Sequence, residues 1–115
     1  MSFQNDLPII QKIYDFYREL YLTVEKMPKK DKYTLGEKMQ SATLNLTELL
    51  ISAGYEEKIK KTIYLDRAAV KLDLIKILVR LGQDLKAVPT NKYLSLEEKL
   101  QEIGRMLGGW IKSLK

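Results

Sequence analysis

The chain has 115 residues, of which 45% are hydrophobic and 30% charged, and its net charge is +5. This length and balance indicate one compact domain with a modest core rather than a disordered chain. Cysteine and histidine are both absent, which excludes disulfides and thiolate catalysis and removes the commonest general base and transition-metal ligand. No apolar run approaches the ~20 residues that span a bilayer, and the first residues lack the pattern of a secretion signal. We therefore expect a cytoplasmic protein with no membrane association and no cofactor.

The first predicted helix covers residues 7–27. Asp6 is a good N-cap, Pro8 suits the first turn, and Pro28 disfavours helical geometry in the residue before it. The apolar residues that we expect to face the core follow at spacings of three and four: Ile10, Ile13, Tyr17, Leu20, Val24 and Met27.

The second predicted helix covers residues 31–53. Its predicted core residues have the same spacing: Leu35, Met39, Ala42, Leu46, Leu49 and Ala53. Gly54 follows at once, and a glycine in this place is typical of a left-handed C-terminal cap.

The third predicted helix, residues 56–86, is the longest and carries apolar residues on two faces. We expect the first face to point towards the core: Ile63, Val70, Leu74, Ile77, Leu81 and Leu85. The second face, formed by Leu72, Ile75 and Val79, is rotated away from the first. It predicts a subunit interface, although a generous core with scattered surface leucines is the alternative.

The fourth predicted helix covers residues 92–113, with Ser95 and Glu98 as a capping box. Its apolar stripe consists of Leu96, Leu100, Ile103, Leu107, Trp110, Ile111 and Leu114. No window has the sustained alternation of a strand. Because the connections are short, the whole chain, residues 1–115, is predicted to form an all-α, up-down-up-down antiparallel four-helix bundle.

Three glycines interrupt the last helix. Each costs a helix interior up to about 1 kcal/mol relative to alanine, so a packing contact should compensate for them. Gly104 and Gly108 are four residues apart and share a face. We predict that a neighbouring helix approaches this face closely at Gly104, Gly108 and Gly109, with Trp110 packed beside it.

Basic residues cluster along the chain, which suggests a surface for polyanions such as nucleic acid. The residues that we expect to form it are Lys26, Lys29, Lys30, Lys32, Arg67, Lys71, Lys76 and Arg80. Lysine-rich surface that is merely solvated remains the alternative on charge alone.

We expect no catalytic and no metal-binding residues. A di-iron bundle needs inward Glu-x-x-His motifs, and the chain has no histidine. Asp66 and Asp73 share a face, but Arg67, Lys71 and Lys76 lie nearby, so structural ion pairs are the favoured interpretation. We therefore expect a protein that is not an enzyme.

Four segments resemble, in their order along the chain, the Avd family, the accessory variability determinants of diversity-generating retroelements. These segments are Leu7–Asp15, Met27–Gly36, Lys71–Leu81 and Glu102–Lys112, and the most specific run is Ile-Gly-Arg-Met-Leu-Gly-Gly-Trp-Ile at residues 103–111. The resemblance implies a four-helix protomer in a ring-shaped homopentamer. It further implies partners: the reverse transcriptase of the element, and nucleic acid, RNA and also DNA. The chain would then support mutagenic reverse transcription without doing chemistry itself.

A sister branch, the proteins encoded in intervening sequences of bacterial ribosomal RNA genes, shares this bundle and ring. Many of its members carry a stretch like Ile-Pro-x-Asn-Ile-Ala-Glu-Gly in the second helix. This chain has Met-Gln-Ser-Ala-Thr-Leu-Asn-Leu-Thr-Glu there, at residues 39–48, which favours the Avd side. An RNA-associated protein of the ribosomal type and an oligomeric scaffold that binds only protein remain the alternative functions.

Overall fold

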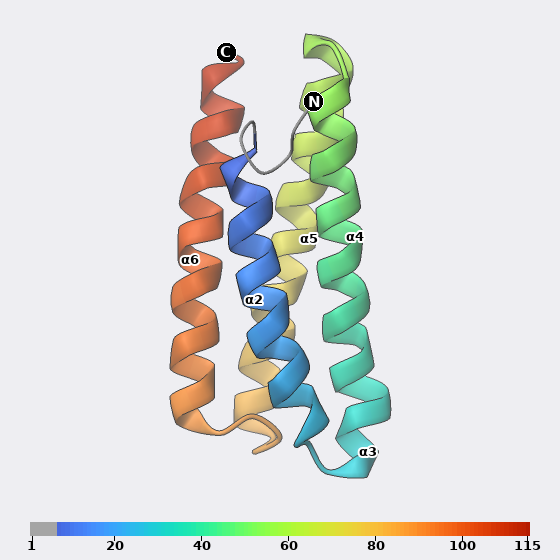
Figure 1. Ribbon diagram of the computed structural model, residues 1–115, viewed down its shortest axis with the longest axis vertical. Helices are drawn as coiled ribbons and strands as arrows, with labels where there is room; N and C mark the ends of the chain where they lie inside the picture. The colour runs from blue at the N-terminus through green and yellow to red at the C-terminus, as the bar shows by residue number, and fades with distance from the viewer. Residues whose placement is uncertain (1–6) are drawn as a thin grey trace.

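The computed structural model describes residues 7–115, and this part of the chain is all-α (Figure 1). Four long helices account for most of it, with two short helical turns between the first and the second. The elements are α2 (Pro8–Glu25), α3 (Lys29–Asp31), the π-helix η1 (Lys32–Gly36), α4 (Glu37–Tyr55), α5 (Lys58–Asp84) and α6 (Thr90–Ser113). The prediction of four long helices without a strand is confirmed for these residues.

The four long helices pack side by side in a body measuring 43 × 23 × 20 Å. Contacts join α2 to α4, α4 to α5, α5 to α6 and α6 back to α2. The connections alternate between the two ends of the molecule, as Figure 1 shows. We call the end with α3 and the α5–α6 connection the lower end, and the end with the α4–α5 connection the upper end.

Helix α2 begins with Pro8 in its first turn, as predicted, whereas the expected cap Asp6 lies outside the described residues. The helix ends at Glu25, two residues earlier than expected. Its core face is rotated slightly from the prediction, because Ile9 and Phe16 are buried while Ile10 and Tyr17 are only half-buried. Ile9 and Ile10 are adjacent isoleucines, so two overlapping stripes fitted the spacing equally well.

Helix α4 is preceded by α3 and η1 without a break, so helical structure starts at Lys29 rather than at Asp31. Leu50 is fully buried where Leu49 was expected. The expected left-handed cap at Gly54 is wrong. Gly54 lies inside α4, no described glycine has a positive φ, and the chain turns through the extended residues Glu56 and Glu57.

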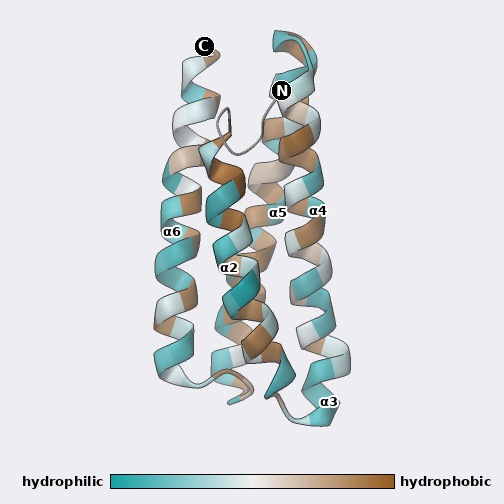
Figure 2. Cartoon of the chain, viewed as in Figure 1, coloured by the Kyte–Doolittle hydropathy of each residue, from teal (hydrophilic) through white to brown (hydrophobic). Residues whose placement is uncertain are grey.

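Helix α5 buries the opposite face from the one predicted. Its core residues are Leu65, Ala68, Leu72, Ile75, Val79 and Gly82. Leu74 is half-buried, and the rest of the predicted core face is exposed: Ile63 (47%), Val70 (71%), Ile77 (63%), Leu81 (41%) and Leu85 (58%). Both faces have helical spacing and are apolar, and Figure 2 shows hydrophobic residues along most of α5. Periodicity could not choose between two such faces; packing against α4 and α6 does.

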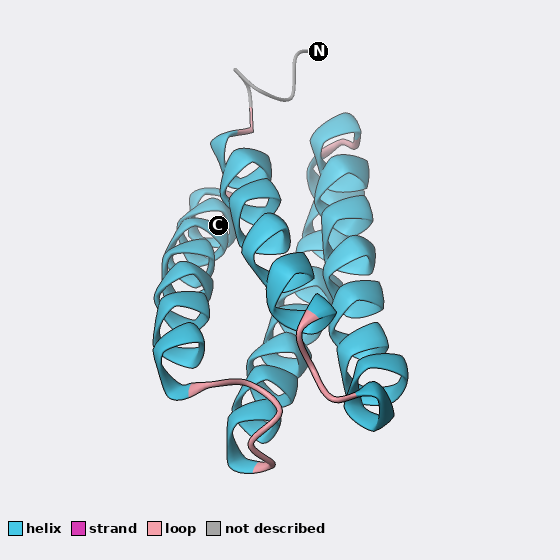
Figure 3. Cartoon of the chain, turned by 60° about the horizontal axis from the view of Figure 1, so that its bottom comes forward, coloured by secondary structure: helices cyan, strands magenta, loops and turns pink. Residues whose placement is uncertain are grey.

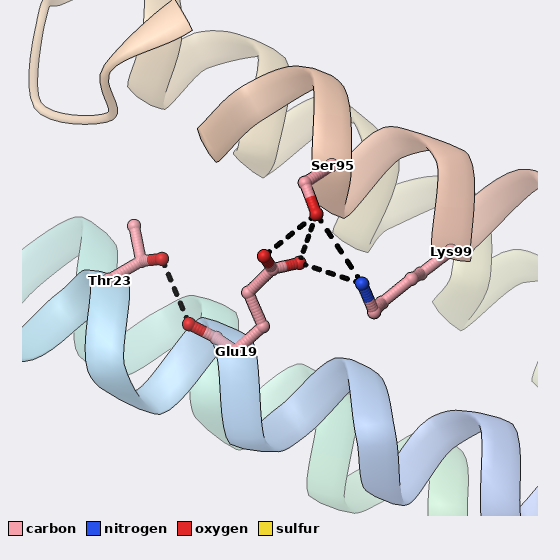
Figure 4. Close-up of polar contacts among 4 residues, drawn as sticks. All are labelled: Glu19, Thr23, Ser95 and Lys99. Atoms are coloured by element: carbon pink, nitrogen blue, oxygen red, sulfur yellow. Dashed lines mark hydrogen bonds and ion pairs between the residues drawn. The ribbon is translucent and has the colours of Figure 1, made fainter. Parts of the chain in front are cut away.

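The predicted capping box at Ser95 and Glu98 is also wrong, because α6 already begins at Thr90. Ser95 instead joins α6 to α2 (Figure 4). Its hydroxyl donates to the Glu19 carboxylate at 2.7 Å, and the Lys99 ammonium lies 3.2 Å from the same carboxylate. The backbone of Glu19 accepts a hydrogen bond from the Thr23 hydroxyl at 2.9 Å. This network ties α2 to α6 at one height.

Candidate nucleic-acid interface

The lower end carries a cluster of lysines that follow α2 directly. Pro28 prevents α2 from continuing, and the chain turns into α3 and η1 with Lys26, Lys29 and Lys30 exposed and Lys32 half-buried. Within residues 7–115, none of these four ammonium groups forms an ion pair with a carboxylate. We call these four residues the lower-end lysines. Cations without fixed partners are available to phosphate groups.

Two further lysines, Lys86 and Lys92, were missed by the sequence-based prediction. Lys86 lies in the α5–α6 connection and Lys92 in the first turn of α6, and both are exposed. The connection between α2 and α3 and the connection between α5 and α6 lie at the same end of the molecule (Figure 3). The sequence did contain a signal for this placement. Successive helices of an antiparallel four-helix bundle alternate in direction, so the first and third connections lie at the same end.

Two exposed tyrosines lie beside one of these cations, Lys32. Tyr21 is 52% and Tyr33 61% exposed, and they line a pocket together with Lys32 and the carboxylates Glu25 and Glu37. The Lys32 ammonium lies 5.9 Å from the centre of the Tyr33 ring. Aromatic faces beside lysines are the combination that stacks on unpaired bases and neutralises their phosphates.

The cations of α5 lie elsewhere, on two different sides of the helix. Arg67 and Lys71 line a groove between α5 and α4. Lys76 and Arg80 line a pocket between α5 and α6. The structure therefore divides the eight predicted basic residues among three places instead of gathering them on one surface.

Tyr93 lines the α5–α6 pocket beside Glu97. Hydrogen bonding to the Glu97 carboxylate, followed by burial, raises the pKa of Tyr93 above its usual value. The phenol therefore remains protonated and neutral at physiological pH.

The ion pairs expected on α5 are not present in the described part of the chain. The ion pairs there are Lys12–Glu102 at 3.1 Å and Lys99–Glu19 at 3.2 Å, and both join α2 to α6. Asp66 and Asp73 are exposed, and neither pairs with the cations next to it.

The predicted interface residues Leu72, Ile75 and Val79 are buried in the core of their own chain, with exposures of 3%, 0% and 1%. This corrects the prediction, because side chains enclosed by α4 and α6 have no surface to offer a second subunit. The outer apolar face of α5 is the one that was expected in the core.

Of the three glycines of α6, Gly104 alone lies close to another helix within residues 7–115, because it faces Lys76 and Leu72 of α5. A Cβ at Gly104 would lie 3.3 Å from the Lys76 ammonium, and one at Gly108 or Gly109 would meet nothing within 4 Å. Trp110 is half-buried at the upper end, where it lines a pocket with Pro8 and other residues. The close approach predicted at Gly108 and Gly109 therefore remains a hypothesis about a second molecule.

In residues 7–115, no three carboxylate side chains are grouped as a metal site would require. No helix in that range is long and apolar enough to cross a membrane.

The fold and its surfaces define a small four-helix protein with a basic end and an apolar outer face on one helix. The chain belongs to the Avd family: the family model described as bAvd-like matches residues 7–114. This confirms the resemblance noted in the sequence, and membership points to an accessory protein of diversity-generating retroelements rather than to an enzyme. No curated protein matches the chain.

Proposed function

We propose that this protein is a non-enzymatic accessory subunit of a diversity-generating retroelement. It binds the reverse transcriptase and nucleic acid, assembles as a ring-shaped homo-oligomer, and supports mutagenic reverse transcription. Family membership over residues 7–114 carries the proposal. The basic lower end supports it, because a polymerase accessory must hold a polyanion near its partner.

In this proposal the lower-end lysines neutralise the nucleic acid backbone. Contacts between lysine and phosphate position a strand without reading its sequence, and each one releases condensed counterions. Tyr21 and Tyr33 add stacking on unpaired bases, which also tolerates any sequence. The site therefore suits a protein that handles a template together with its copy.

A comparison of the two ends of the bundle tests the nucleic-acid site. Lys26→Glu, Lys29→Glu and Lys30→Glu together should lower RNA affinity and reduce the salt slope by about 2, because about three phosphate contacts are lost. The matched control changes Lys58, Lys61 and Lys112 to glutamate, which removes the same charge near the upper end and leaves the outer face of α5 unchanged. Fluorescence anisotropy with a labelled RNA at several salt concentrations measures both. Equal losses in the two variants would contradict the placement of the site.

A tagged pull-down from source cells with nuclease treatment tests the polymerase partner. Recovery of a reverse transcriptase supports the accessory role, since nuclease removes partners bridged only by RNA. Recovery of RNA-binding activity without the polymerase, in cells shown to express one, would instead favour the ribosomal-RNA-associated type of protein. Loss of both would leave a scaffold that binds only protein.

A further inference from the structure

The outward face of α5 carries a continuous apolar stripe that no other part of residues 7–115 covers. Ile63, Val70 and Ile77 are each seven residues apart and 47%, 71% and 63% exposed, and Leu81 continues the stripe at 41%. Seven residues are two helical turns, so these side chains lie in one line along about 27 Å of helix. A line of this kind, with half-exposed aliphatic residues, is typical of a helix that packs against another helix.

The charges beside the stripe are segregated by sign. Lys60 and Arg67 are seven residues apart, and Lys71 is one turn further on. Arg67 and Lys71 line the groove towards α4, so this side is the basic flank of the stripe: Lys60, Arg67 and Lys71.

The opposite side is the acidic flank. Asp66, Asp73 and Arg80 follow one another at intervals of seven residues, and Arg80 lines the pocket towards α6. Asp84 follows Arg80 by one turn. The acidic flank therefore consists of three aspartates, Asp66, Asp73 and Asp84, and two cations of the same helix, Lys76 and Arg80, lie beside them.

Charges from the neighbouring helices leave the signs unchanged. Glu48 of α4 faces the groove on the basic flank, which keeps three cations against one carboxylate. Glu97 of α6 and Lys76 face the pocket on the acidic flank, which keeps four carboxylates against two cations. None of the α5 flank residues forms an ion pair within the described part of the chain.

We propose that the α5 stripe binds the α5 stripe of a second copy of this chain in a parallel orientation, with the basic flank of one copy against the acidic flank of the next. The inference rests on the homo-oligomer in the proposed function and specifies its contact face and polarity. In a parallel arrangement the basic flank of each α5 faces the neighbour on one side, and its acidic flank faces the neighbour on the opposite side. Each basic flank therefore meets an acidic flank. Contacts between unlike surfaces form rings when the rotation from one copy to the next closes.

The same charges oppose an antiparallel pair. When two such helices run in opposite directions, each flank faces its own counterpart, so lysine and arginine meet lysine and arginine, and aspartate meets aspartate. Like-charge contacts across an interface weaken it. The segregation of sign therefore selects polarity, which an apolar stripe alone does not.

The groove beside the basic flank has room for side chains of the neighbour. It encloses about 580 Å³ between α4 and α5, and its lining includes Leu49, Tyr64 and Val70. A second copy that brings its acidic flank to Arg67 and Lys71 also brings apolar side chains of its own stripe to this groove. Burying them there supplies the hydrophobic part of the contact.

The stripe is tested by Val70→Glu with Ile77→Glu, measured by analytical ultracentrifugation of the full chain. The wild type should be an oligomer, and the variant should dissociate with an affinity loss of at least about 100-fold. The matched control is Tyr14→Glu with Leu22→Glu on α2, two residues of similar exposure (59% and 58%). Circular dichroism should show unchanged helicity in both. A monomeric wild type, or equal loss in the control, would overturn the proposal.

A charge swap tests the flanks. The double variant Arg67→Asp with Lys71→Asp should weaken assembly about tenfold, and so should the double variant Asp66→Lys with Asp73→Lys. In each of them the two flanks of α5 carry charge of the same sign, so neighbouring copies repel each other. The variant with all four changes has both signs again and should assemble like the wild type. Failure of this rescue would contradict flank-to-flank pairing.

Polarity is tested by disulfide cross-linking, for which the cysteine-free chain is suited. A single Ile63→Cys lies near one end of the stripe, so it meets its own counterpart only in a parallel contact and should cross-link on oxidation. In an antiparallel contact, Ile63→Cys would cross-link with Leu85→Cys on another chain, and that outcome would overturn the proposal. RNA affinity, measured separately on the same proteins, shows whether the proposed function holds independently of the interface.

Discussion

At the scale of single residues, the glycines that matter for folding are not the ones that stand out in the sequence. A Cβ at Gly36 would lie 2.7 Å from Val24 Cγ1, and one at Gly82 would lie 2.8 Å from Val88 Cγ2. Both distances are too short for a real contact, so these two positions need glycine for close packing. Gly108 and Gly109, in the glycine-rich end of α6, have open space beside them instead.

Substitution by alanine should therefore have opposite effects at two helical glycines. Gly82→Ala should lower the free energy of unfolding by about 1 kcal/mol, because overpacking costs more than the gain in helix propensity. Gly108→Ala should raise it by up to about 1 kcal/mol. Chemical denaturation of the two variants under conditions that keep the chain monomeric measures both. A loss of stability at Gly108 would show that our account of the open space is wrong.

Lys86 is the one described non-glycine residue with a positive φ, 62°. It ends α5, and the next two amides, of Ala87 and Val88, donate to the Gly82 carbonyl at 2.8 and 3.0 Å. A residue with a Cβ is less stable than glycine in this left-handed conformation by about 1 kcal/mol. Lys86→Gly should therefore raise the midpoint of urea unfolding, whereas Lys86→Ala should leave it within error of the wild type.

At the scale of helices, one polar network fixes how α2 sits against α6. Ser95 and Lys99 on α6 both contact the Glu19 carboxylate, which is 20% exposed. Partial burial makes such charge-assisted contacts stronger than ion pairs on the open surface. The alignment of the two helices is thus specified by polar groups, since apolar stripes alone permit sliding.

Ser95→Ala should lower the free energy of unfolding by about 1–2 kcal/mol, because a half-buried carboxylate loses its hydroxyl donor. Ser113→Ala is the matched control. Its hydroxyl also donates a hydrogen bond, to the Trp110 carbonyl at 2.6 Å, but at the exposed end of α6. The control should change stability by less than about 0.5 kcal/mol, and thermal melts can distinguish the two. Equal effects would mean that the network does not restrain α6.

At the scale of the whole molecule, the proposed functions occupy separate surfaces. The lower end holds lysines and exposed tyrosines, whereas the outer face of α5 holds an apolar stripe with charged flanks. A ring built through α5 would repeat the lower-end lysines around its rim and so present one chain of nucleic acid with several equivalent sites. Several weak sites on one assembly bind far more tightly than one of them alone.

Salt, and not pH, should control binding of nucleic acid. The chain has no histidine, the side chain that ordinarily titrates between pH 5 and 8. RNA affinity should therefore change less than about threefold between pH 6 and 8, while it falls steeply between 50 and 200 mM salt. Anisotropy titrations over both ranges measure this, and a strong pH dependence in that window would point to a different kind of contact.

Much of the architecture could be predicted from local patterns. The all-α class, four long helices and the break at Pro28 follow from spacing and from the steric limits of proline. Family membership could also be predicted, because the Ile103–Ile111 run is specific. The ends of helices were less predictable: Gly54 and Ser95 look like capping residues, yet α4 and α6 continue through them.

Two apolar faces on α5 can be recognised from the order of its residues, because both have helical periodicity. Which face is buried became known only from the packing of the helices: Leu72 and Ile75 face inward, while Val70 and Ile77 face outward. Likewise, the lysines were visible in the sequence, but only the fold separated those of the lower end from those of α5. The physical reason is the same in both cases. Periodicity says which side chains share a face, whereas the choice of the buried face depends on packing against other helices.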